Sequence, residues 1–153
     1  MSWLLAGLLC LVAFVSEQAM AGAGSSAAVK NTRQPSWTLP ASGALGLTFV
    51  YYTACLVVAQ RLIAQGVGAS PAREAFVLLI VLLASNVIFA WLFFRRRDLR
   101  AGFLLSLPYA VLVAALILTL SRFDPFSAWA VAIYAVSLPY SVTWSYSVWK
   151  MNS

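Results

Sequence analysis

The chain has 153 residues, of which 63% are hydrophobic and 9% charged, and its formal net charge is +6. Soluble domains average roughly 45–50% apolar and about 25% charged residues, so this composition excludes an ordinary water-soluble fold. The sequence contains no His and only two Cys, which argues against a metal site, a disulfide framework and hydrolytic chemistry.

Five long apolar runs predict five membrane-spanning helices in a single membrane domain over residues 1–153. A helix of about 20 residues crosses a hydrocarbon core about 30 Å thick, and continuous runs of this length lack the alternation of a membrane β-barrel. We expect an all-α integral membrane protein, a bundle of five helices with short loops and membrane lipid around it. In chain order, the predicted helices cover residues 3–22, 42–64, 75–94, 101–121 and 126–148.

The first apolar run has a second interpretation. Leu4 to Val15, followed by Ala19 to Ala21 (AMA), resembles the hydrophobic core and cleavage site of a signal peptide. No Lys or Arg precedes the run, which favours a retained helix, whereas cleavage would leave four helices. Glu17 lies in the same segment, and a carboxylate there either faces the interior of the bundle or is solvated near the interface.

Asn86 lies in the middle of the third predicted helix. An amide that faced lipid without a partner would be costly, so we expect this side chain to face other helices. Phe89 and Phe93 follow at i+3 and i+7 and share its face. The residues therefore predict either a cross-link between helices or a polar contact beside two rings in a ligand pocket.

Similar stripes of small, polar and aromatic residues occur on the second and fifth predicted helices. Such a stripe either permits close helix approach or lines an aromatic pocket. On the second helix the stripe contains Thr48, Tyr52 and Cys55. On the fifth it contains Tyr134, Ser137, Ser141, Trp144 and Val148.

Two further patterns concern the last two helices. The sequence SLPY occurs at Ser106 to Tyr109 and again at Ser137 to Tyr140, and each proline predicts a kink because it removes one helical hydrogen bond. At the C-terminus Val142, Tyr146 and Lys150 fit a weak pattern proposed for cholesterol recognition.

The ten Lys and Arg stand at the ends of apolar runs, a placement that indicates membrane orientation and not nucleic-acid binding. The face that holds the N-terminus carries Arg61, Arg73 and Arg122. The opposite face carries Lys30, Arg33, Arg95, Arg96, Arg97, Arg100 and Lys150. Under the positive-inside rule, this bias predicts an external N-terminus and a cytoplasmic C-terminus, in a bacterial or a mitochondrial membrane.

Three local motifs, taken in order and with their spacing, resemble the TspO/translocator protein family of tryptophan-rich sensory proteins. Pro35 to Trp37 (PSW), with Tyr52 at the expected distance, is similar to the family's P-S-W-x-P-P stretch before its second helix. Asn86 with Phe93 and Phe94 is similar to the third-helix pattern N-x-x-W-x-P-x-F-F. Tyr146 to Asn152 (YSVWKMN) resembles the closing pattern N-Y-x-[VI]-W-[RK]-x-N.

The resemblance implies a homodimer whose five helices enclose a pocket for porphyrins such as haem and protoporphyrin, with sterol recognition near the C-terminal motif in some members. It implies no required cofactor. Its ligand contacts would be Trp37, Thr48, Tyr52, Asn86, Phe89, Phe93, Ser137, Ser141 and Trp144. Thr48 and Phe89 stand where the family has Trp, so we do not expect the light-driven porphyrin breakdown of some bacterial members.

We therefore expect a receptor or carrier that binds a flat hydrophobic ligand, porphyrin-like or sterol-like, by stacking and a few hydrogen bonds. We do not expect an enzyme, and a bound haem would lack the usual imidazole ligand because the chain has no His. Two alternatives come from other classes. One is a small structural or assembly subunit of a larger membrane complex, and the other is an ion-coupled transporter that would need a buried, functional Glu17.

Overall fold

The computed structural model describes residues 1–22, 31–68 and 70–153, and the described residues contain helices and no strand. Five spans are long and apolar enough to cross a membrane, so the protein is a multi-pass integral membrane protein, as the sequence predicts. Two of the spans consist of two consecutive elements each. The elements are α1 (Ser2–Ala21), α3 (Ala41–Gln65), α4 (Ser70–Ala90), η1 (Trp91–Arg95), α5 (Leu99–Ser121), α6 (Pro125–Ala135) and α7 (Leu138–Met151).

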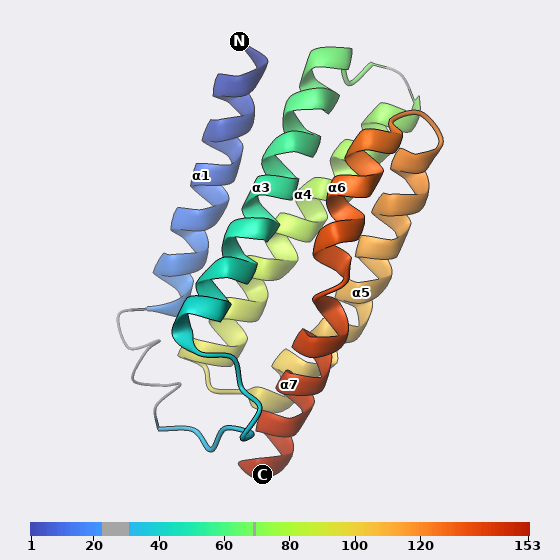
Figure 1. The fold of residues 1–153 in the computed structure, drawn as a ribbon. Helices are drawn as coiled ribbons and strands as arrows, with labels where there is room; N and C mark the ends of the chain where they lie inside the picture. The colour runs from blue at the N-terminus through green and yellow to red at the C-terminus, as the bar shows by residue number, and fades with distance from the viewer. Residues whose placement is uncertain (23–30, 69) are drawn as a thin grey trace.

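The helices run up and down beside one another, with the two termini at opposite ends of the bundle (Figure 1). α1 packs against α3 and α4, and α5 packs against α4, α6 and α7. The core is made of aliphatic side chains, and Val58, Leu62, Leu79, Leu116 and Leu120 are fully buried in it. Cys10 and Cys55 are buried free thiols, as expected of packing residues.

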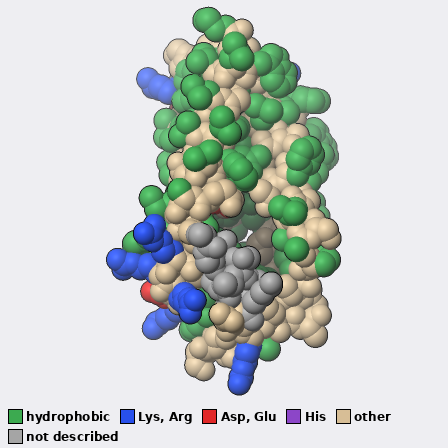
Figure 2. Space-filling view, turned by 90° about the vertical axis from the view of Figure 1, so that its left-hand side faces the viewer, with side chains coloured by type: hydrophobic (Ala, Val, Ile, Leu, Met, Phe, Trp, Pro, Cys, Tyr) green, Lys and Arg blue, Asp and Glu red, His purple; other side chains and the backbone are tan. Residues whose placement is uncertain are grey.

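The outer surface of the bundle is apolar over most of its length. Large hydrophobic side chains such as Leu4, Val111 and Trp129 are 78%, 69% and 71% exposed, which in water would be an unusually large apolar patch. Figure 2 shows hydrophobic side chains over most of one face and most of the basic side chains gathered at one end. That end holds Arg95, Arg96, Arg97 and Lys150, whereas Lys30 lies outside the described residues.

The predicted helix boundaries are close to those of the structure except in the third and fifth spans. The third span begins at Ser70 and not at residue 75, because Pro71 is tolerated in a first helical turn, where its missing N–H has no intrahelical partner. The same span ends in a π-helical turn, Trp91–Arg95, for which the sequence holds no clear signal.

The fifth span also differs, because it is two helices and not the single helix predicted over 126–148. α6 ends at Ala135, and α7 begins at Leu138 with Pro139 in its first turn. The kink predicted at the second SLPY is in the structure a break between two helices, since proline cannot donate the helical hydrogen bond at that point. Pro108 of the first SLPY lies inside α5, which continues through it as one α-helix.

Candidate functional site

A small interior cavity of about 110 Å³ lies between α4, α5, α6 and α7. It lies beside the break between α6 and α7, and residues on both sides of that break line it. Its wall combines aromatic rings, aliphatic side chains and short hydroxyl-bearing residues. The lining residues are Asn86, Phe89, Leu105, Ser106, Tyr109, Tyr134, Leu138, Ser141 and Val142.

Hydroxyl groups give this cavity its polar character. The phenol oxygens of Tyr109 and Tyr134 lie 2.9 Å apart and share a hydrogen bond. Ser106 and Ser141 each donate their hydroxyl proton to a backbone carbonyl of their own helix, which leaves their oxygens as acceptors. The buried hydroxyl of Tyr51, whose ring lies 5.0 Å from that of Tyr134, has no hydrogen-bond partner among the described residues.

A carboxylate joins three helices beside this cavity. The Oε2 atom of Glu17 in α1 accepts a hydrogen bond of 2.6 Å from the Tyr52 hydroxyl in α3 and one of 2.8 Å from Asn86 Nδ2 in α4. Asn86 therefore faces other helices, as its sequence context predicts. Glu17 is half-buried and held by protein donors, so it is not a freely solvated interfacial residue.

The sequence-predicted ligand residues fall into separate groups in the structure. Asn86, Phe89 and Ser141 line the interior cavity. Thr48 and Tyr52 instead line a wider groove of about 460 Å³ between α1 and α3. The predicted ligand residues thus line two separate spaces. Glu17 accepts a hydrogen bond from one lining residue of each, Tyr52 of the groove and Asn86 of the cavity.

The remaining predicted residues lie around these two spaces. Phe93 is buried, and its ring centroid lies 5.3 Å from Phe89 and 5.1 Å from Trp144, so these rings form one aromatic row. Trp37 lies on the first loop, with its ring 5.6 Å from that of Tyr140. Ser137 lies at the break between the helices and donates its hydroxyl to the Tyr134 carbonyl.

Residues 33–39 of the first loop, which connects α1 to α3, are held against α7 at several points. Tyr140 accepts a hydrogen bond from the Leu39 amide at 2.9 Å, and Trp144 Nε1 donates to Gln34 at 3.1 Å. Asn152 both accepts from the Arg33 amide and donates to the Arg33 carbonyl. These contacts place the loop against α7, whose first two turns line the cavity.

The three residues of the sterol pattern do not share one environment. Val142 lines the interior cavity, whereas Tyr146 is 43% exposed and its ring packs 5.2 Å from Phe103. The Lys150 ammonium lies 4.7 Å from the ring centroid of Trp149.

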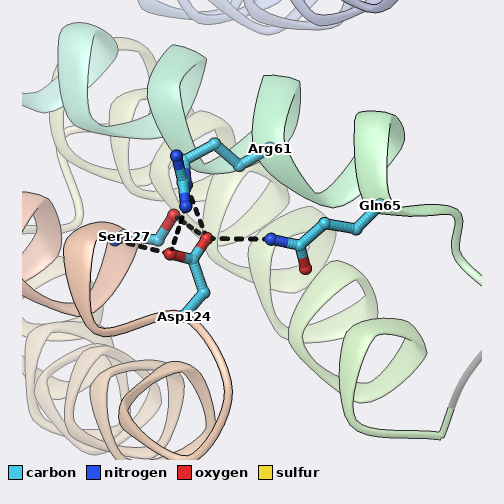
Figure 3. Close-up of polar contacts among 4 residues, drawn as sticks. All are labelled: Arg61, Gln65, Asp124 and Ser127. Atoms are coloured by element: carbon cyan, nitrogen blue, oxygen red, sulfur yellow. Dashed lines mark hydrogen bonds and ion pairs between the residues drawn. The ribbon is translucent and has the colours of Figure 1, made fainter.

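Sequence reasoning missed an ion pair at the N-terminal end of the bundle (Figure 3). Asp124, which is 2% exposed, accepts hydrogen bonds from Arg61 Nε at 2.7 Å and Arg61 Nη2 at 2.9 Å. Ser127 Oγ donates to it at 2.7 Å and Gln65 Nε2 at 3.5 Å. Asp124 before Pro125 is a recognisable helix-start signal, but nothing in the sequence links it to Arg61.

The hydrogen bonds between Arg61 and Asp124 hold the loop between α5 and α6 against α3. Burial disfavours the charged form of Asp124, but the hydrogen bonds from Arg61 and Ser127 outweigh it and hold the pKa of the carboxyl below its ordinary value. The same carboxylate caps α6 by accepting from the Ser127 amide.

Comparison with known proteins agrees with this architecture. No curated protein matches the chain. The sequence model of the TspO/MBR family, however, matches residues 5–150 of the 153 residues, which includes all or nearly all of each of the five spans. The resemblance predicted from the three local motifs is thereby confirmed, and the chain belongs to the TspO/MBR family.

Proposed function

We propose that this protein is a membrane receptor or carrier that binds a flat hydrophobic ligand, a porphyrin such as haem or a sterol-like molecule, between its helices. The observation that carries this proposal is the interior cavity, which places aromatic rings and hydroxyl groups together within an apolar bundle. Membership of the TspO/MBR family supports it. Binding would need no cofactor and no covalent step.

The lining of the cavity suits such a ligand. Phe89, Tyr109 and Tyr134 offer ring faces on which a planar molecule can stack. The oxygens of Ser106 and Ser141 can accept hydrogen bonds from ring N–H or hydroxyl groups. A mainly apolar wall with a few polar groups is typical of small-molecule sites.

The size of the cavity sets a condition on binding. Ligand sites usually enclose about 300–1,000 Å³, whereas this cavity has about 110 Å³. A tetrapyrrole therefore enters only if the bundle opens. The contacts of the first loop with Tyr140, Trp144 and Asn152 are the ones that would separate, since they hold the loop against the helix that lines the cavity.

Titration of the purified protein in detergent with haem or protoporphyrin tests this proposal, with a Soret shift and Trp quenching as readouts. Ser141→Leu should weaken binding by at least about tenfold, because the larger side chain fills the cavity. Thr143→Leu is the matched control, since Thr143 is exposed on the same helix. Equal affinity of the two variants would exclude the cavity, and no spectral change with wild-type protein would refute porphyrin binding.

We also infer that the protein is a homodimer, as its family suggests. Large apolar side chains are also exposed on α5 and α6, such as Val111, Trp129 and Ile133, and they offer a surface on which a second copy could pack. Light scattering with subtraction of the detergent mass measures this directly. The mass of two chains is the expected result, and the mass of one chain would refute it.

A further inference from the structure

The groove between α1 and α3 is the larger of the two spaces, at about 460 Å³. This volume falls within the range of about 300–1,000 Å³ typical of ligand sites. Its walls are almost entirely apolar and include Leu11, Phe14, Leu45 and Phe49, which are 39–74% exposed. The groove thus opens toward the surrounding lipid, from which a hydrophobic chain could enter.

Glu17 does not line this groove itself but is hydrogen-bonded to Tyr52, which does. It follows Phe14 at i+3 on the same face of α1, and the Phe14 ring packs edge-on against Tyr52 at 5.4 Å. A carboxyl group therefore stands beside two aromatic side chains that line the groove.

This carboxylate lies deep in the bundle. Tyr52 is 11 residues from the start of α3 at Ala41, which corresponds to about 16 Å along the helix axis. Figure 1 shows that α1 ends part of the way along the bundle, well before the level of the C-terminus. Glu17, one turn before the end of α1, is thus joined to a residue near the middle of α3.

Two neutral donors, Tyr52 at 2.6 Å and Asn86 at 2.8 Å, hold the Glu17 carboxyl group. Among the described residues, no Lys or Arg lies within 4.0 Å of Glu17. A carboxylate at membrane depth without a cation is costly, so a cationic group that reaches it is stabilised.

We propose that the α1–α3 groove binds a cationic amphiphile, with its apolar chain along the groove and its protonated amine on Glu17. The rings of Phe14 and Tyr52 flank the ammonium group and add a cation–π attraction. This site is separate from the interior cavity and does not depend on porphyrin or sterol binding there. The ligand class follows from the acidic group beside the groove and the apolar character of the groove's walls.

Binding of radiolabelled dodecylamine to the full chain in phosphatidylcholine nanodiscs tests the charge, with the uptake of empty discs subtracted. Glu17→Gln should weaken binding by about tenfold or more, because glutamine can still accept the bonds from Tyr52 and Asn86 but carries no charge. Asp98→Asn is the matched control, since Asp98 caps α5 outside the groove and asparagine caps equally well. N-dodecylacetamide, which is uncharged, should bind wild type and Glu17→Gln equally weakly.

Two glycines test the groove itself. A Cβ added at Gly7 or at Gly46 meets nothing within 4 Å, so the backbone leaves room for a side chain to start at either position. Gly7 lines the groove and Gly46 does not. Gly7→Leu should therefore weaken dodecylamine binding by about tenfold or more, as expected when a ligand site is filled, whereas Gly46→Leu should not.

Three results would overturn the proposal. The first is equal dodecylamine affinity of wild type and Glu17→Gln, and the second is equal affinity of Gly7→Leu and Gly46→Leu. The third is a dimer in the nanodisc that excludes dodecylamine, which would assign the groove to a second copy. Ser141→Leu should leave dodecylamine binding unchanged, so a failure of this proposal is distinguishable from a failure of porphyrin binding.

Discussion

Replacing Asp124 with Ala removes the acceptor of each hydrogen bond drawn in Figure 3. Bonds to a charged group contribute about 1.5–3 kcal/mol each when fully buried, but the Arg61 side chain is 38% exposed, so its share is smaller. Loss of the α6 cap costs about 1 kcal/mol more. We expect Asp124→Ala to lower the free energy of unfolding by about 2–3 kcal/mol in total.

The matched variant Asp124→Asn separates the charge from the cap. Asparagine can still cap α6, so this variant should lose about 1 kcal/mol less than alanine. Unfolding of the purified protein by titration with SDS, followed by helical circular dichroism, measures both values. Equal losses for the two variants, or a loss below about 0.5 kcal/mol for alanine, which is usual for an ordinary surface change, would refute the account.

The pH dependence of unfolding provides a second measurement of the same carboxylate. Because its pKa is lower in the folded protein than in the unfolded chain, the unfolded chain binds the proton more tightly. The stabilisation should therefore be fully present above about pH 4, the ordinary Asp range, and be lost as the pH falls through the lowered value. Wild type should lose this increment on acidification and Asp124→Asn should not, and parallel pH profiles would contradict the prediction.

Three further predictions follow from other parts of the bundle. Glu17→Gln should raise the unfolding free energy of the protein without added ligand by about 1 kcal/mol, because insertion scales assign about 2.5–3.5 kcal/mol to a charge at the membrane centre and Glu17 is half-buried. A decrease in the SDS titration would instead identify a stabilising cross-link. Gly102→Ala places a Cβ 2.8 Å from Phe93 and should cost about 1–3 kcal/mol, and an unchanged unfolding midpoint would refute this contact. Ser153→Cys should resist a membrane-impermeant maleimide in whole cells and react after lysis, since the charge bias predicts a cytoplasmic C-terminus. Labelling in intact cells would contradict this prediction and place the C-terminus outside.

Hydropathy was enough to place the five spans, because a lipid environment admits helices of one length and excludes most alternatives. Boundaries were less certain where local chemistry overrides hydropathy. Pro71 is compatible with a first helical turn, and Pro139 ends one helix and begins another. The π-helical turn at Trp91–Arg95 has no clear signal in the local sequence.

The candidate site was harder to predict, because residue spacing gives the face of one helix but not the helix that it meets. Asn86 could be assigned to a helix interface from its depth alone, whereas its partner Glu17 is 69 residues away. Thr48 and Ser141 each belong to a plausible polar stripe, and only the packing of the helices shows that one lines the groove and the other the cavity. The Arg61–Asp124 pair was missed for the same reason.

The stoichiometry of protoporphyrin uptake tests the central claim most directly, since a site within the bundle is saturable and the surrounding lipid is not. Protein in nanodiscs would be titrated with protoporphyrin, and the uptake of empty discs would be subtracted. Saturation at one protoporphyrin for each chain, lost in Ser141→Leu and retained in Thr143→Leu, is the predicted result. Uptake that rises linearly and equals that of empty discs would contradict a ligand site between the helices.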